Sequence, residues 1–203
     1  MNTEHEFDDI EYVRQWTATA DERRPQRPAM FRYVAALIRD LGLESPRVLE
    51  LGCGPGALAD VLLAELADIT YEGVDYSGAM LELARERLAR FGGRPRLTRA
   101  DLNDPEWLRA IRTPVDAVVT NQALHDLGSD EAVATTYRRV HALLPARGLF
   151  VNAELVIPAD GSKPAKPGKM TTAAHLEALR QAGFHAVRCA VDHGEYVCLV
   201  AMR

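Results

Sequence analysis

Short apolar segments typical of buried strands alternate five times with segments of helical periodicity. The expected strands are residues 47–51, 71–75, 96–99, 115–120 and 149–154. A helical pattern follows each of them, so neighbouring strands need not be joined by tight turns. Crossover helices connect parallel strands and cover both faces of the sheet that those strands form. The alternation therefore predicts an α/β fold with a mostly parallel sheet at its centre.

Two further strand patterns close the chain, at residues 186–191 and 196–202. Only the short segment Asp192–Glu195 separates them, and a connection of that length joins antiparallel neighbours. We therefore expect a seven-stranded sheet that ends in an antiparallel hairpin. A helix from Pro28 to Leu41 precedes the first strand, whereas residues 1–27 show no regular pattern. The expected organisation is an N-terminal arm, 1–27, followed by one domain, 28–203.

Composition narrows the class of protein. The chain has 203 residues, of which 47% are hydrophobic, and this is enough to bury a core without disulfides. Its net charge of −5 argues against a nucleic-acid-binding surface. No apolar run is long enough for a membrane helix, and the acidic N-terminus does not resemble a signal peptide. Three cysteines suit a reducing compartment, so we expect a cytoplasmic protein. No residue set has metal-ligand spacing, and no feature indicates an oligomeric state.

Polar residues at the strand ends predict a nucleoside site. The first strand runs into the segment Gly52–Gly56, with sequence GCGPG, whose glycines allow a tight turn and close approach of the backbone to a ligand. The second strand ends in Asp75, 23 residues after Gly52, and a carboxylate there can accept both hydroxyl hydrogens of a ribose. Asp101 follows the third strand and could accept from an exocyclic amine.

The cofactor class needs a further argument, because the glycine segment also fits the dinucleotide pattern G-x-G-x-x-G/A of nicotinamide oxidoreductases. Glu50 precedes the glycines, and an additional carboxylate suits a cationic ligand better than a pyrophosphate. The fourth strand ends in the polar segment Asn121–His125, where a methyl acceptor could lie. These features favour S-adenosylmethionine, with an NAD(P)-dependent oxidoreductase as the alternative and a non-catalytic binding module as a third possibility.

Five motifs in a fixed order carry a resemblance to a known family. They are VLELGCGPG (Val48–Gly56), GVDYSGAML (Gly73–Leu81), ADL (Ala100–Leu102), DAVVTNQALHDL (Asp116–Leu127) and LLPARGLFV (Leu143–Val151). The chain resembles class I S-adenosylmethionine-dependent methyltransferases, especially the small-molecule group near the ubiquinone/menaquinone-type enzymes. The resemblance implies a single Rossmann-like three-layer sandwich that transfers a methyl group to a small-molecule acceptor.

The same resemblance implies a cofactor site at the strand ends. Its glycine loop would hold the methionine moiety, Asp75 the ribose and Asp101 the adenine amine. Leu102 would offer a backbone contact to the adenine ring, beside Tyr76 and Met80, and the end of the fourth strand would lie near the sulfonium. The expected cofactor-binding residues are Glu50, Gly52, Cys53, Gly54, Asp75, Tyr76, Met80, Asp101, Leu102, Asn121, Gln122 and Ala123.

The sequence gives weaker indications of the residues that contact the methyl acceptor. A base is needed only if the acceptor must first lose a proton, and His125 is the best-placed candidate, followed by Glu154. Tyr12 and Trp16 are expected to contact the acceptor or cofactor, with ordinary packing as the alternative. The arm would then cover the site. Its arginines, Arg23, Arg24 and Arg27, are available for an acidic acceptor or for the cofactor carboxylate.

Methylation of nucleic acid or protein is the rival substrate class. Methyltransferases that act on nucleic-acid bases commonly carry an Asn/Asp-Pro-Pro-aromatic motif after the fourth strand. The corresponding segment here, Asn121–Leu124, has neither proline nor an aromatic residue, so no nucleic-acid partner is expected. Two histidines outside the motifs, His175 and His193, are expected at the solvated surface.

Overall fold

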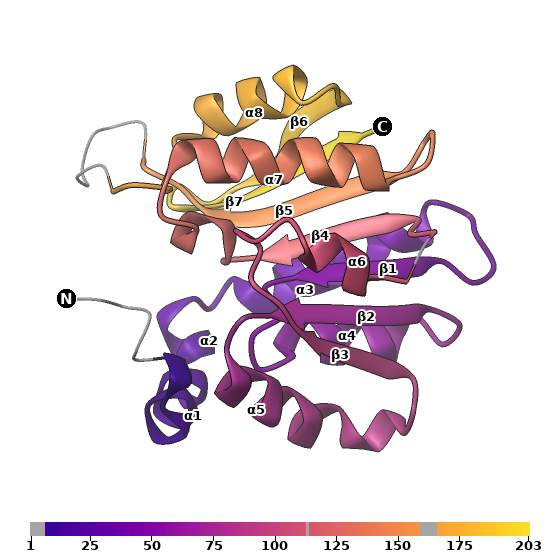
Figure 1. Ribbon diagram of the computed structural model, residues 1–203, viewed down its shortest axis with the longest axis vertical. Helices are drawn as coiled ribbons and strands as arrows, with labels where there is room; N and C mark the ends of the chain where they lie inside the picture. Colours follow the sequence, from indigo (N-terminus) through magenta and orange to yellow (C-terminus); the bar gives the residue numbers. More distant parts are fainter. Residues whose placement is uncertain (1–6, 113, 159–165) are drawn as a thin grey trace.

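The computed structural model describes residues 7–112, 114–158 and 166–203, which form an α/β sandwich around one sheet (Figure 1). The strands are β1 (Arg47–Leu51), β2 (Thr70–Asp75), β3 (Pro95–Arg99), β4 (Ala117–Asn121), β5 (Leu149–Leu155), β6 (His185–Asp192) and β7 (Tyr196–Met202). Their order in the sheet is β3-β2-β1-β4-β5-β7-β6. The first five strands are parallel, and β7 runs antiparallel to both β5 and β6. The expected fold class is confirmed.

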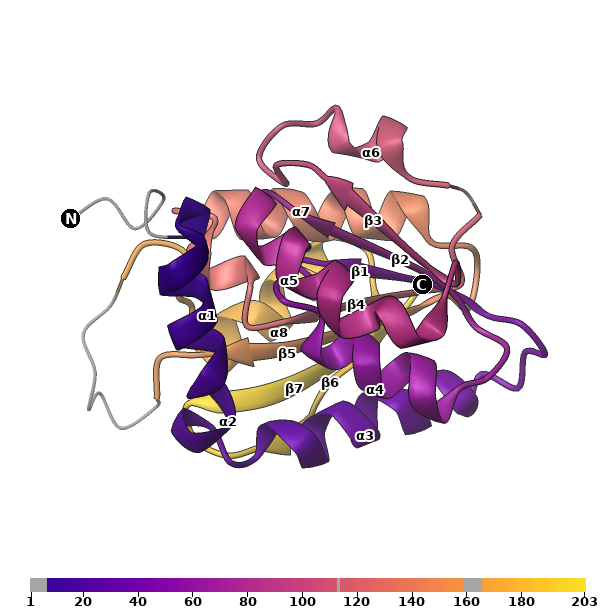
Figure 2. The ribbon, with the colours of Figure 1, turned by 90° about the horizontal axis from the view of Figure 1, so that it is seen from below.

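Helices cover both faces of the sheet (Figure 2). They are α1 (Ile10–Ala18), α2 (Ala20–Arg23), α3 (Arg27–Arg39), α4 (Ala57–Glu65), α5 (Gly78–Leu88), α6 (Trp107–Ala110), α7 (Asp130–Leu143) and α8 (Thr172–Gln181), with the short 3₁₀ helices η2 (Ala89–Phe91) and η3 (Leu124–Asp126). One core cluster lies between the sheet and α3, α4 and the end of α5, and the other lies under α6, α7 and α8.

The alternation of side chains along β1 assigns its residues to the two cores. Leu49 and Leu51 belong to the core under α6, α7 and α8, whereas Val48 belongs to the core under α3 and α4. Successive side chains of a strand point to opposite faces, so Glu50 shares the face of Val48. An acidic side chain is therefore buried on the α3–α4 side, directly before the glycine turn.

The N-terminal segment is more regular than its sequence pattern indicates. Asp9 caps α1 by accepting hydrogen bonds from the N–H groups of Glu11 and Tyr12 at 2.8 and 3.1 Å. Only Val13 of this helix is fully buried, where it packs against α5. Ile10, Val13 and Trp16 recur at helical spacing after the Asp9 cap, so the helical pattern is present in the sequence but spans only nine residues. α1 and α2 lie beyond the carboxyl ends of the parallel strands (Figure 2).

One expectation about the surface was wrong. His175 was predicted to be solvated, but it is fully buried in α8, and its Nδ1 lies 2.7 Å from the hydroxyl of Tyr137 on α7. The helical spacing of His175 and Leu179 places both on the face of α8 that packs inward. His193 is exposed in the β6–β7 turn, as predicted.

Among the described residues, no helix combines the length and the apolar character that crossing a membrane requires.

The turn after β1 passes close to the segment that follows β4, and a substitution at Gly52 tests this close approach. Gly52 has a φ of +63°, and a Cβ at this position would overlap the side chain of Ala123 after β4. Gly42, just after α3, has nearly the same φ, +68°, but a Cβ there would meet nothing within 4 Å. Both Gly→Ala changes carry the left-handed cost of roughly 1–2 kcal/mol, whereas only Gly52→Ala adds overpacking of about 1–3 kcal/mol.

We therefore expect Gly52→Ala to lower the free energy of unfolding in urea by at least about 1 kcal/mol more than Gly42→Ala does. Equal losses in the two variants would show that the β1 turn has room for a side chain.

Candidate functional site

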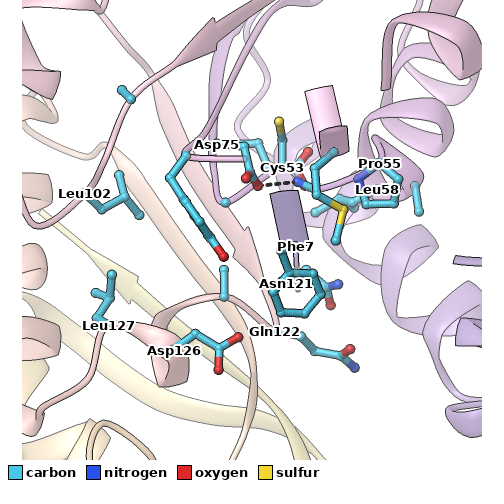
Figure 3. A pocket seen from close by; sticks show the side chains of 18 of the residues that line it. Phe7, Cys53, Pro55, Leu58, Asp75, Leu102, Asn121, Gln122, Asp126 and Leu127 are labelled. Carbon is cyan, nitrogen blue, oxygen red and sulfur yellow. Dashed lines mark hydrogen bonds between the residues drawn. The ribbon is translucent and has the colours of Figure 1, made fainter. Parts of the chain in front are cut away.

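A cavity of about 470 Å³ opens at the carboxyl ends of β1, β2, β3 and β4 (Figure 3). Its volume is within the range of small-molecule sites. All the sequence-predicted cofactor residues lie on its wall: Glu50, Gly52, Cys53, Gly54, Asp75, Tyr76, Met80, Asp101, Leu102, Asn121, Gln122 and Ala123. The structure thus brings together residues that span more than seventy positions of the sequence. Their roles in binding stay predictions.

Asp75 links the glycine turn to the start of α5. Its Oδ2 accepts a hydrogen bond from the N–H of Gly54 at 2.8 Å, drawn in Figure 3, and its Oδ1 accepts one from the N–H of Ser77 at 2.9 Å. Burial raises the pKa of Asp75, and the backbone hydrogen bonds oppose that rise. A carboxylate has about four acceptor positions, so Asp75 retains capacity for ligand hydroxyl groups.

Glu50 is a second buried acid on the cavity wall. It is 2% exposed, and its Oε2 accepts a hydrogen bond of 2.7 Å from the hydroxyl of Tyr71. Burial raises the pKa of Glu50 to about 8, with the Tyr71 hydrogen bond acting in the opposite direction. A cation bound in the cavity would favour the ionised form of this carboxyl group.

Cys53 lies between these two acids in the sequence and is also buried. Burial raises the pKa of its thiol well above the ordinary value, with Asp75 and Glu50 adding to the shift. A thiol of this kind stays protonated at neutral pH, because the thiolate would be poorly solvated. The structure therefore favours a packing role for the Cys53 side chain over a nucleophilic one.

The β3 and β4 side of the cavity contributes polar groups of a different kind. Asp101 is exposed and accepts a hydrogen bond from the N–H of Asn103 at 2.9 Å. Gln122 has a left-handed φ of +52°, which is uncommon for a residue with a Cβ. Its side-chain Nε2 is buried and has no hydrogen-bond partner among the described residues. An unpaired buried amide is costly, which marks Gln122 as a candidate for contact with a ligand.

The partly exposed His125 and the buried Glu154 form a pair behind the cavity wall. The Nδ1 of His125 lies 2.7 Å from Oε1 of Glu154, which is fully buried. Oε2 of Glu154 accepts from the N–H groups of Leu124 and His125 at 2.9 and 3.3 Å. His125 is not among the residues that line the cavity, but its neighbour Asp126 is, with Oδ2 3.5 Å from His125 Nε2.

His125 and Glu154 shift each other's pKa values. Burial alone would lower the pKa of His125, but the Glu154 carboxylate outweighs it and the pKa is raised. Burial alone would raise the pKa of Glu154, yet His125 lowers it below the ordinary value. Burial raises the pKa of the adjacent Asp126. The arrangement is that of a carboxylate which orients an imidazole, one nitrogen of which stays directed away from it.

The N-terminal segment reaches the same cavity. Phe7, Asp8 and Trp16 line it, and the Ser77 hydroxyl donates a hydrogen bond to the backbone oxygen of Phe7. Tyr12 is not among the lining residues; its ring packs edge-on against Phe7 with centroids 5.7 Å apart. Of the two aromatic residues expected on the acceptor side, Trp16 therefore lies on the wall and Tyr12 lies behind it.

Some lining residues were missed at the level of sequence. Asp8 and Asp126 lie on the wall, although neither was singled out: Asp8 lies within the arm, and Asp126 lies within the motif Asp116–Leu127. An isolated acid in a polar segment carries no signal of its own. Among the three arm arginines, Arg27 lines the cavity whereas Arg23 and Arg24 do not. In the described parts of the chain, no group of three or more His, Cys, Asp or Glu side chains could hold a metal ion.

The buried Glu50 predicts a pH dependence of stability. The folded chain holds a proton on Glu50 up to about pH 8, whereas an unfolded chain releases it near the ordinary glutamate pKa of about 4.3. The contribution is therefore fully present below about pH 4 and is lost as the pH rises through about 8. We expect the free energy of unfolding to fall between about pH 5 and 8 more steeply in the native sequence than in Glu50→Gln. Parallel pH profiles from urea unfolding would contradict this.

Comparisons with known proteins agree with this geometry. A protein family described as "Methyltransferase domain" matches residues 49–150. A trans-aconitate 2-methyltransferase of Methylobacterium radiotolerans is 36% identical over 136 residues, which cover 66% of this chain and 45% of that protein. One from Delftia acidovorans is 34% identical over 121 residues, covering 59% and 42%. The chain thus spans about half the length of the curated relatives it matches.

Solved structures show the same fold. S-adenosylmethionine-bound CalS10, an amino pentose methyltransferase from Micromonospora echinaspora, superposes with a TM-score of 0.73 at 21% identity, covering 93% of this chain and 96% of that one. An O-methyltransferase family protein from Burkholderia thailandensis has a TM-score of 0.74 at 20% identity, with coverages of 97% and 61%. The narrower ubiquinone/menaquinone-type assignment stays a prediction. From the family match and the sheet order together, the chain belongs to the class I S-adenosylmethionine-dependent methyltransferases.

Proposed function

We propose that this chain binds S-adenosylmethionine in the cavity and transfers its methyl group to a small-molecule acceptor. The observation that supports this most is the convergence of twelve motif residues from four strand ends on one cavity. Family membership fits the proposal, and the curated relatives are named for a small carboxylic acid, trans-aconitate. Because the chain covers less than half of those relatives, its own acceptor is to be tested directly.

The charges of the cavity suit this cofactor better than a dinucleotide. Its wall carries the acidic residues Asp8, Glu50, Asp75, Asp101 and Asp126. Arg27 is the one basic side chain on the wall that the described residues form. A pyrophosphate would meet repulsion from most of these acids, whereas a sulfonium and an ammonium group would be attracted. The site therefore fits a cationic nucleoside.

Each part of the cofactor has a candidate partner. Asp75 keeps acceptor positions for the ribose hydroxyl groups, and the exposed Asp101 is free to accept from the adenine amine beside the hydrogen bond it already makes. Glu50 faces the cavity with a carboxyl group that an ammonium would ionise. The buried Nε2 of Gln122 can donate to an acceptor or cofactor oxygen.

When bound, S-adenosylmethionine supplies a methyl group on a sulfonium, which is already a strong electrophile. The main task of the chain is then to hold the acceptor in line with that group and to exclude water. Fixing two reactants in this way is worth as much as about 7–11 kcal/mol. Gln122 and Ala123 line the cavity together with the aromatic residues Phe7 and Trp16, which gives the acceptor a bounded space.

His125 is the proposed base for an acceptor that must lose a proton. Glu154 fixes the imidazole through Nδ1, which leaves Nε2 as the proton-accepting nitrogen. Glu154 also accepts from the backbone N–H groups of Leu124 and His125, so the same carboxylate positions the segment after β4. Glu154 is thus a positioning residue rather than a second base.

We further propose that the N-terminal arm, 1–27, of which the structure describes 7–27, covers the acceptor side, with 28–203 as the catalytic domain. The support is that Phe7, Asp8 and Trp16 line the cavity and that α1 packs on α5. Excluding water in this way favours methyl transfer over side reactions.

Cofactor binding is tested by calorimetry with adenosylhomocysteine, NAD and NADP. Asp75→Asn places an amide N–H₂ against the N–H groups of Gly54 or Ser77. It also removes the negative charge of the carboxylate that would accept hydrogen bonds from the ribose hydroxyl groups. We expect it to weaken adenosylhomocysteine binding by roughly 1.5–3 kcal/mol. The control is Asp60→Asn, on α4 and away from the cavity, which should bind adenosylhomocysteine with the affinity of the native chain. Binding of NAD without adenosylhomocysteine would refute the proposal, as would full affinity in folded Asp75→Asn.

The arm is tested by Trp16→Ala. Because Trp16 lines the cavity, its loss should lower kcat/KM for labelled methyl transfer by about 10-fold through a less constrained acceptor. Arg14→Gln is the matched control in the same helix: Arg14 makes an exposed ion pair with Glu86, which contributes little to stability. If Trp16→Ala and Arg14→Gln have the same rate, the arm serves only for packing.

The base is tested with two kinds of acceptor. His125→Gln should lower kcat about 10²–10⁴-fold for a hydroxyl or amine acceptor. It should leave kcat with trans-aconitate nearly unchanged, because the carboxylates of trans-aconitate are already ionised. With the native chain, the rate on a proton-bearing acceptor should rise with pH through the raised pKa of His125. Glu154→Gln should move this profile to lower pH, since it removes the charge that raises that pKa. A pH profile that neither change alters would contradict the assignment.

A further inference from the structure

Gln122 places a polar side chain on the cavity wall. Its Nε2 is buried and makes no hydrogen bond among the described residues. The neighbouring amide differs, because Oδ1 of Asn121 accepts a hydrogen bond of 2.7 Å from the hydroxyl of Tyr196. An amide nitrogen carries two N–H donors, and burying them unpaired is costly. The amide of Gln122 is therefore suited to a partner that enters the cavity.

The backbone holds Gln122 in an uncommon conformation at this position. Its φ of +52° lies in the left-handed region, which residues with a Cβ seldom adopt. Its N–H donates to the backbone oxygen of Ala153 on β5 at 2.8 Å, and the next residue, Ala123, lies directly against Gly52. The fold thus fixes the backbone of Gln122 from two sides, through β5 and through the turn after β1. Backbone strain that the surrounding structure maintains in this way is concentrated at sites that hold ligands.

The order of the strands separates Gln122 from the groups that suit a nucleoside. Asp75 ends β2 and Asp101 follows β3, whereas Gln122 follows β4, on the other side of β1. Asn121 and Asp126 lie on the same side of the cavity as Gln122 (Figure 3). A nucleoside held by Asp75 and Asp101 would have its ribose oxygens near β2. The oxygen nearest to Gln122 would then belong to the methyl acceptor.

We propose that Gln122 selects a methyl acceptor that carries a carbonyl-type oxygen, to which its side-chain amide donates a hydrogen bond. Carboxylates and carboxamides both present such an oxygen, and an uncharged donor can bind either of them. This inference rests on the proposed function, because it names the class of acceptor for that same site. The experiment includes both kinds of oxygen and therefore separates them.

The test measures the transfer of labelled methyl groups to three trans-enoic acids of similar size. Each has one carboxylate that can be methylated, and its other end is a carboxylate in fumarate, a carboxamide in fumaramate and a methyl group in crotonate. An oxygen of the first carboxylate forms the new O–CH₃ bond, and the S–CH₃ bond breaks with its electron pair left on sulfur. The products are a methyl ester and adenosylhomocysteine, and no proton is released.

We expect the native chain to have a kcat/KM at least about 10-fold higher for fumarate, fumaramate or both than for crotonate. The preferred acid identifies the kind of oxygen that Gln122 binds. Gln122→Met keeps the length of the side chain but removes the donor. It should lower kcat/KM about 10-fold for the preferred acid and less than about 2-fold for crotonate. Gln122→Glu adds a negative charge and should weaken transfer to fumarate more than transfer to fumaramate.

Two further measurements on Gln122→Met separate this role from a structural one. The affinity for adenosylhomocysteine should stay within about 2-fold of the native value, because the cofactor does not use this amide. The urea midpoint of the free chain should be unchanged or raised, because a buried unpaired amide is replaced by an apolar group of similar shape. The same replacement at Gln181, an exposed glutamine of α8, is the control and should change none of these values.

A lowered urea midpoint for Gln122→Met would show that the amide serves the fold, and weaker adenosylhomocysteine binding would assign it to the cofactor. Either result overturns the inference, as do equal losses for all three acids or no loss for any. If the native chain binds adenosylhomocysteine but methylates none of the acids, the inferred acceptor class is wrong and the proposed cofactor site stands. If it does not bind adenosylhomocysteine, the proposed function itself fails.

Discussion

The hydrogen bonds of Asp75 are the constraint on which the site depends. A single carboxylate at the end of β2 holds the N–H of Gly54 in the turn after β1 and the N–H of Ser77 at the start of α5. Two strand-to-helix turns are thereby fixed relative to each other without a metal or a disulfide. Ser77 continues the connection, because its hydroxyl donates to the backbone of Phe7 in the arm. Asp75 and Ser77 thus hold together cavity residues that are distant in the sequence.

Burying two acidic side chains in one cavity has an energetic cost. Glu50 and Asp75 both have raised pKa values because they are buried, and both face the same space. Burying acids is costly, so the free chain reduces this cost by holding a proton on Glu50 and by hydrogen bonds such as that from Tyr71. A cationic nucleoside would relieve the same cost directly. We therefore expect charge selectivity against phosphate-rich cofactors to follow from burial as much as from shape.

Much of this arrangement could be predicted from the sequence, since it depends on local patterns. The strand periodicity, the glycine turn and the acids at the strand ends each occupy a few consecutive residues, and the sheet brings them together. The rest depends on tertiary contacts. α1 has an apolar stripe but is only nine residues long, so its pattern is easily overlooked, and His175 is buried because α8 packs against α7. Nothing local distinguishes Arg27, which is buried, from the exposed Arg23 one turn earlier.

Glu154 illustrates why a site residue need not carry the chemistry that its charge suggests. Its two oxygens receive the Nδ1 side of His125 and the N–H groups of Leu124, His125 and Leu155. A carboxylate satisfied in this way has a lowered pKa and is a weak base, whatever its distance from an acceptor. What it transmits is orientation, because it holds both the imidazole and the backbone that leads into the cavity wall. The imidazole with its raised pKa is therefore the group of this pair that can exchange a proton near neutral pH.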